Sequence, residues 1–178
     1  MFDPKSLLDK GWTALGNHQP EEACDLFAQA VAEARFIENY VLLANALMAL
    51  GQTECGMNHP ATAIDCYREA AAVCARAGDP ARQAAALVEV AEILRTQKKT
   101  EASIAICEQL LALPQLSDNA APLPRARALH MLALAGEDSA NHDELALLLQ
   151  AAAALYEAAG EPGRAAECKS NLAFLQGR

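Results

Sequence analysis

The chain has 178 residues, enough for one ordinary domain, and its 53% of hydrophobic and 21% of charged residues exclude a disordered chain. No uninterrupted apolar run is long enough to cross a bilayer, so no membrane association is expected. A net charge of −9 without a basic stripe argues against a nucleic-acid partner. Six scattered cysteines, none in a CxxC pair, and an N-terminus without an apolar signal core predict a cytoplasmic location.

The residue types along the chain predict helices only. Alanine and leucine dominate, β-branched residues are few, and strand signals are nearly absent. Pro20, Pro60 and Pro80 stand at positions where helices are expected to begin. In chain order, helices are predicted at residues 4–17, 20–35, 37–56, 60–77, 80–97, 99–113, 123–136, 142–159 and 162–176.

One turn sequence occurs twice, as Gly78-Asp79-Pro80 and as Gly160-Glu161-Pro162. Glycine can end a helix in the left-handed conformation, and an acidic residue can cap the next helix. Proline then suits the first helical position, where its missing N–H is no loss. Because the connection is so short, the joined helices are expected to be antiparallel neighbours.

Several residue columns recur about every 40 residues, which indicates a repeat of helix pairs. A small residue in the first helix of each pair would let the second helix approach closely. The second helix carries small, bulky apolar and small residues in turn. The small-residue column is Gly11, Gly51, Ala91, Ala133 and Ala173, and the bulky or soft apolar column is Phe27, Tyr67, Cys107 and Leu149. No helix pair can bury its apolar face alone, so the pairs must stack.

This pattern resembles the tetratricopeptide repeat family, on "LDKGW…EEACDLFAQAV" in the first unit and "LMALGQ…ATAIDCYREAA" in the second. The unit is longer than the family's usual 34 residues and is similar to its longer-helix variety. HEAT and armadillo repeats share this length and are the alternative. The resemblance implies an all-α solenoid of about four stacked helix-turn-helix repeats and a C-terminal capping helix.

The resemblance also implies the domain organisation. We expect one superhelical domain over residues 1–178, with repeats at 4–35, 37–77, 80–113 and 123–159 and a capping helix at 162–176. The segment Pro114–Arg125 interrupts the pattern with three prolines and is interpreted as a surface connection or as a loop that meets a partner.

In such a stack the first helices line the concave side, and this geometry predicts the binding residues. The predicted peptide-binding residues are Leu8, Trp12, Leu15, Asn45, Met48, Gln52, Val88, Glu89, Glu92, Arg95, Arg127, His130, Met131, Leu134 and Phe174. Glu89 and Glu92 make the centre acidic, which suits a peptide or amphipathic helix with a basic residue or two. Trp12 is interpreted either as a binding anchor or as a core residue.

No phosphate-binding glycine loop or HExxH motif occurs, so no catalytic residue, metal or cofactor is predicted. The sequence therefore predicts a non-catalytic scaffold or adaptor that binds a protein or peptide partner. The alternative is a self-associating, homodimeric regulatory or structural protein. An enzyme is the third and most distant hypothesis.

Overall fold

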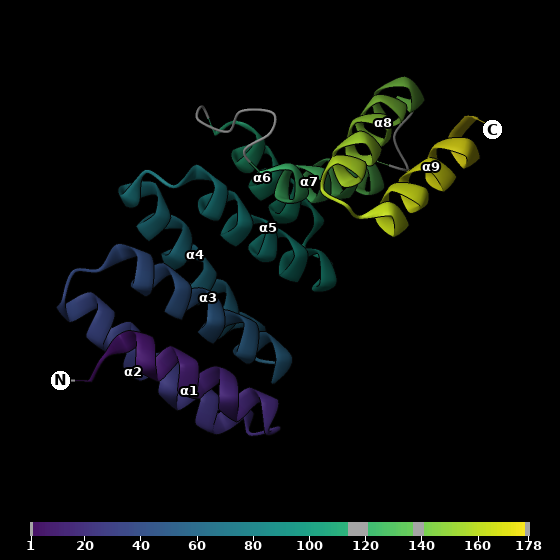
Figure 1. Ribbon diagram of the computed structural model, residues 1–178. Coiled ribbons are helices and arrows are strands. Elements are labelled where there is room, and N and C mark those ends of the chain that lie inside the picture. Colours follow the sequence, from purple (N-terminus) through teal and green to yellow (C-terminus); the bar gives the residue numbers. More distant parts are fainter. Residues whose placement is uncertain (1, 114–120, 137–140, 177–178) are drawn as a thin grey trace. The chain divides into compact units, whose positions relative to one another are not determined.

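The computed structural model describes residues 2–113, 121–136 and 141–176. Across these residues the chain is helical and contains no strand, so the all-α prediction is confirmed (Figure 1). The helices are α1 (Pro4–Gly16), α2 (Pro20–Phe36), α3 (Tyr40–Gly56), α4 (Pro60–Ala77), α5 (Pro80–Thr96), α6 (Thr100–Leu111), α7 (Pro122–Ala135), α8 (His142–Ala158) and α9 (Pro162–Gln176).

The helix bounds differ from the prediction mainly where a cap decides them. The third helix was expected from residue 37, but the Asn39 side chain accepts a hydrogen bond from the Leu42 N–H, so α3 begins at Tyr40. Of the interruption predicted at Pro114–Arg125, residues 114–120 lie outside the described part of the chain. Its last residues, from Pro122 onward, form the first turn of α7.

The chain divides into two compact units, Met1–Ile93 and Leu94–Arg178. In the first unit each helix packs against the next from α1 to α4, and α1 also contacts α3. In the second unit α6 packs against α7, α7 against α8, and α8 against α9 (Figure 1). Helix α5 begins in the first unit, and its last residues belong to the second.

Within residues 2–113 and 141–176 the same turn joins consecutive helices at six places, although the sequence shows it plainly at only two. One residue of each turn has a positive φ between 54° and 76°, namely His18, Glu38, Asn58, Gly78, Lys98 and Gly160. The next N–H then donates to the carbonyl five residues earlier, as from Asp79 to Cys74 at 2.9 Å and from Gln19 to Ala14 at 3.0 Å. This is the Schellman pattern of helix termination. A conformation that favours glycine is therefore held at four sites by other residues.

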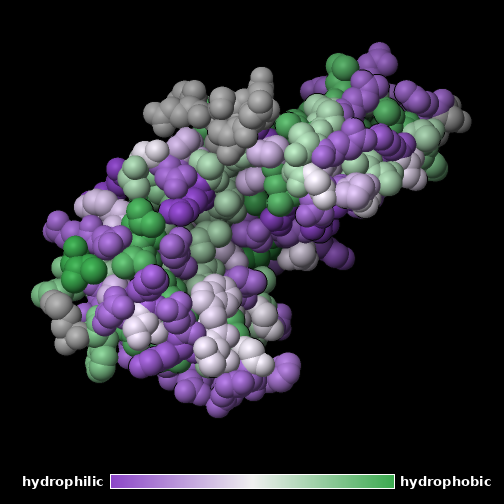
Figure 2. Space-filling model, in the orientation of Figure 1, coloured by the Kyte–Doolittle hydropathy of each residue, from purple (hydrophilic) through white to green (hydrophobic). Residues whose placement is uncertain are grey.

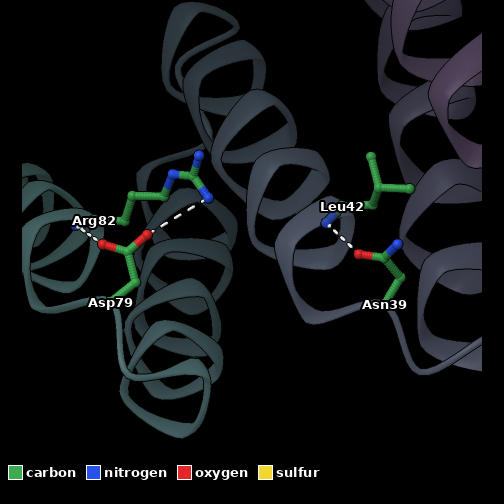
Figure 3. A network of polar contacts seen from close by, with 4 residues as sticks. All are labelled: Asn39, Leu42, Asp79 and Arg82. Carbon is green, nitrogen blue, oxygen red and sulfur yellow. Dashed lines mark hydrogen bonds and ion pairs between the residues drawn. The ribbon is translucent and has the colours of Figure 1, made fainter.

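The helices α1, α3 and α5 begin with side-chain caps. Asp3 accepts from the N–H groups of Lys5 and Ser6, each at 3.2 Å. Figure 3 shows the next two caps, in which Asn39 accepts from the Leu42 N–H at 3.1 Å and Asp79 from the Arg82 N–H at 3.0 Å. Helices α2 and α4 have no such cap and begin with proline at the first position.

The repeat columns form the core of the first unit. Gly11 and Gly51 are buried, and they face Phe27 and Tyr67 of the following helices. A Cβ at Gly11 would lie 2.7 Å from Phe27 Cδ1, whereas one at Gly51 would lie 3.2 Å from the Tyr67 ring. The small residue therefore makes room for the aromatic ring of the following helix, in addition to the close approach of the two helices predicted from the sequence.

The second unit has a core of the same kind. Ala133 of α7 is buried against α8 and α9, where Tyr156 is 1% and Cys168 0% exposed. The small-residue column ends at Ala173, which is exposed because no further helix of the described chain follows α9. Lys169, which replaces leucine in its column, is also exposed and pairs with Glu157 of α8.

Candidate functional site

A groove with a volume of about 680 Å³ opens in the first unit. Helices α1, α3 and α5 supply nearly all of its walls, and α4 contributes one aromatic side chain. The lining residues are Lys5, Leu8, Asp9, Trp12, Leu42, Asn45, Met48, Ala49, Gln52, Tyr67, Arg82, Ala85 and Glu89. This volume lies within the range typical of small-molecule binding sites.

Trp12 is the most prominent apolar side chain of the groove. It is 46% exposed, and its ring lies edge-on to Phe27, with 5.1 Å between the ring centroids. The contact with the buried Phe27 fixes one side of the indole, and the other side faces the groove. The sequence left open whether Trp12 is a core or a binding residue. In the structure its ring packs against the core residue Phe27, and the side chain also lines the groove.

Two amide side chains line the groove on α3. Asn45 and Gln52 are exposed, seven residues apart on one helix face, and neither side chain makes a hydrogen bond within the described chain. An amide offers both a donor and an acceptor, so it can bind the C=O and N–H groups of another backbone. These two side chains can therefore bind the backbone of a peptide whatever its side chains are.

The groove carries charges of both signs. Lys5 and Asp9 come from α1, while Arg82 and Glu89 come from α5. Arg82 Nη1 lies 3.5 Å from Asp79 Oδ2, the residue that also caps α5 (Figure 3). The sequence predicted an acidic centre, but the two basic residues balance the two acidic ones among the lining residues.

The structure brings one group of the predicted site residues together. Leu8, Trp12, Asn45, Met48, Gln52 and Glu89 all line the groove. Leu15 lies in a neighbouring pocket, whereas Glu92 and Arg95 do not line the groove. Val88 was predicted to face a ligand, but it is only 1% exposed, because it lies on the buried side of α5 beside Leu87. That assignment is corrected to a core residue.

The residues predicted in the second unit have mixed positions. His130 and Met131 were predicted to face a ligand, but each is 7% exposed, so both pack in the interior. The His130 ring lies 3.4 Å from the Asn171 amide nitrogen and edge-on to Tyr156, which explains its burial. Arg127 and Leu134 are half-buried, and Phe174 is 63% exposed.

Lys5, Leu42, Tyr67 and Arg82 line the groove although the sequence reasoning did not place them there. Lys5 and Leu42 each stand three residues before a predicted residue, Leu8 and Asn45, and Arg82 stands three residues before Ala85, which also lines the groove, so all three extend the inner face by one helical turn. This spacing was a signal that could have found them. Tyr67 gave no such signal, because it was assigned to the core column of the second helix.

The buried thiols of the chain are poor nucleophiles. Burial, with help from the nearby Glu54 carboxylate, raises the pKa of Cys24 to about 12. Burial also raises the pKa of Cys66 and of Cys168 to about 11. A thiol with such a pKa stays protonated near neutral pH, and the thiolate is the reactive form. These side chains therefore act as small apolar packing residues.

In the part of the chain that the structure describes, no three histidine, cysteine, aspartate or glutamate side chains are grouped so that they could hold a metal ion. No helix there combines the length and the apolar character that spanning a membrane requires.

The repeated turn, the small-residue columns and the groove define a class of protein: an α-helical repeat protein built from stacked helix pairs. Residues 8–76 match the family model described as "Tetratricopeptide repeat", which confirms the resemblance seen in the sequence. Over these residues the chain carries tetratricopeptide repeats. No curated protein sequence matches it.

Solved structures show the same fold at low sequence identity. A putative kinesin light chain with nearly identical TPR-like repeats from Podosopora anserina is 18% identical, with a TM-score of 0.61 over 99% of this chain and 97% of that one. BtubC (BKLC) from P. vanneervenii is 16% identical, with a TM-score of 0.64 over 94% and 77%. MamA is 15% identical, with a TM-score of 0.57 over 93% and 94%. The predicted class, an α-solenoid of stacked helix pairs, is thereby confirmed, and this fold is a general scaffold for protein–protein interaction.

Proposed function

We propose that the chain is a non-catalytic scaffold whose first unit binds an extended segment of a partner protein in the groove between α1, α3 and α5. The observation that carries this proposal is the combination of an exposed aromatic anchor, Trp12, with two unpaired amides, Asn45 and Gln52. Exposed tryptophan side chains often dominate binding energy, and amides can hold a backbone.

The spacing of the two amides favours an extended segment over a helix. Seven residues of α3 rise about 10.5 Å, which matches about three residues of extended backbone. Asn45 and Gln52 can therefore contact backbone groups that lie about three residues apart along one bound extended segment. A helical ligand has already paired its own backbone groups internally and would leave both amides unused.

Selection from a library of random 12-residue peptides, followed by fluorescence polarisation, tests this proposal. Trp12→Ala and Gln52→Ala should each weaken the selected peptides, by roughly 10-fold or more for the tryptophan. Phe36→Ala and Gln29→Ala are matched controls, because both side chains are exposed and neither lines the groove. The proposal fails if wild-type protein selects no peptide, or if the groove variants bind as their controls do.

Self-association is the second candidate function. It is favoured by large apolar side chains exposed on the second unit, Leu147 at 65% on α8 and Phe174 at 63% on α9. On the face drawn in Figure 2, hydrophobic residues are interspersed with hydrophilic ones. Sedimentation equilibrium tests this alternative: a monomer at high concentration rejects it, and a dimer dispersed by Leu147→Ser supports it.

A further inference from the structure

A second pocket, with a volume of about 430 Å³, lies in the first unit where α1 ends and α2 begins, against the last turn of α3. We name it the end pocket. Its lining residues are Leu15, His18, Pro20, Gln52, Thr53, Gly56 and Met57. Gln52 also lines the groove, so one amide side chain stands at the boundary between the two sites.

The local chain geometry leaves the end pocket open. His18 holds the left-handed position of the α1–α2 turn, with φ at 59°, and Pro20 then begins α2. Across the pocket, Gly56 ends α3 without a side chain, and a Cβ built there would meet no atom within 4 Å. The space beside Gly56 is therefore open.

The end pocket differs from the groove in its charge. The groove is lined by two basic and two acidic residues, whereas His18 is the only titratable residue that lines the end pocket. The Thr53 hydroxyl already donates to the Ala49 carbonyl at 2.9 Å, so it needs no hydrogen-bond acceptor from a ligand. The other contacts come chiefly from Leu15, Pro20 and Met57, and a methionine adapts readily to the shape of an apolar partner.

We propose that the end pocket binds one uncharged apolar side chain, such as leucine, isoleucine or methionine, of the same segment that occupies the groove. This inference rests on the proposed function. Gln52 holds the backbone of the segment at the junction, and the adjacent side chain enters the end pocket. The partner is thereby defined more closely, as an extended segment with an apolar residue a fixed distance from the residue that contacts Trp12.

The NMR signals of methionine methyl groups report on the groove and on the end pocket separately. The chain contains Met48 in the groove, Met57 in the end pocket and the buried Met131 in the second unit. In a protein labelled with ¹³C at the methionine methyls, the peptides selected on wild-type protein should shift the Met48 and Met57 signals and leave Met131 unchanged. They should also share an apolar position at constant spacing.

Two leucine variants provide a matched pair for the affinity measurement. Gly56→Leu adds a bulky side chain to a residue that lines the end pocket. Gly16→Leu is also at the last position of its helix, with no atom within 4 Å of a built Cβ, but Gly16 lines neither site. Gly56→Leu should weaken the selected peptides about 10-fold or more, as expected for losing one buried apolar side chain. Gly16→Leu should leave the affinity unchanged. Replacing the apolar residue of the peptide by aspartate should weaken binding to wild-type protein equally.

The outcomes separate this inference from the proposed function. Peptides that bind and shift Met48 but not Met57, or that bind the Gly56→Leu and Gly16→Leu proteins equally, overturn the end pocket and leave the groove standing. Failure to select any peptide on wild-type protein overturns both. The NMR readout and the peptide substitution use wild-type protein, so they decide the question even where Gly56→Leu disturbs folding.

Discussion

Replacing Gly11 by alanine tests whether the small-residue column exists to admit an aromatic ring. The new Cβ would lie 2.7 Å from Cδ1 and 2.8 Å from Cζ of Phe27, well inside ordinary contact distance. Phe27 is 0% exposed, so its ring cannot swing into solvent to relieve the overlap. Overpacking of this kind costs about 1–3 kcal/mol. Alanine also gains about 1 kcal/mol of helix propensity over glycine, so the net loss should reach up to about 2 kcal/mol.

Denaturant unfolding followed by circular dichroism measures this loss, and the fluorescence of Trp12 reports it locally. Trp12 is the only tryptophan and contacts Phe27, so displacement of the ring should change its emission. Gly16→Ala is the control on the same helix, because its Cβ would meet nothing within 4 Å. Gly51→Ala should fall between the two, since its Cβ would lie 3.2 Å from Tyr67.

A second substitution checks the cause. Combining Gly11→Ala with Phe27→Leu should be less destabilising than the sum of the two single changes, because the smaller side chain makes room for the new methyl group. The explanation is refuted if Gly11→Ala is as stable as Gly16→Ala. It is also refuted if the double variant shows no coupling.

Three further predictions concern the turns and the thiols. Glu38→Gly should raise the free energy of unfolding by up to about 1 kcal/mol, and Gly78→Ala should lower it by about 1 kcal/mol. The reason is that both positions have a positive φ, which favours glycine. Opposite or equal shifts in denaturant unfolding would contradict this. Iodoacetamide at pH 8 should alkylate the exposed Cys55 first, and mass spectrometry showing earlier labelling of a buried cysteine would reject the assignment. Burial raises the pKa of Cys24 to about 12 and of Cys66 to about 11, so the folded state binds these protons more tightly than the unfolded state does. The free energy of unfolding should therefore fall as the pH rises from the pKa of the unfolded thiols, near 9, toward these folded values. Cys24→Ala should flatten that decline, and an unchanged slope would contradict the prediction.

The sequence by itself determined the helices and their pairing. Alanine-rich segments, prolines at helix starts and the Gly78-Asp79-Pro80 turn predict local structure, because they act through neighbouring residues alone. The recurrence of Gly11 and Gly51 opposite Phe27 and Tyr67 also identified the packing columns, since a stacked repeat must bury the same positions in every unit. Part of the groove followed from this register, including Trp12, Asn45 and Gln52.

Other features were decided by the tertiary structure. His18, Glu38, Asn58 and Lys98 adopt the left-handed turn although their residue types do not demand it, because the helices on both sides fix the chain direction. Val88 and His130 share the predicted inner face but are buried, since the depth of a side chain depends on neighbouring helices as well as on its own helix. The end pocket forms because the α1–α2 turn lies against Gly56 and Met57. The spacing of residues within one helix cannot predict this contact, because it joins segments that are far apart in the sequence.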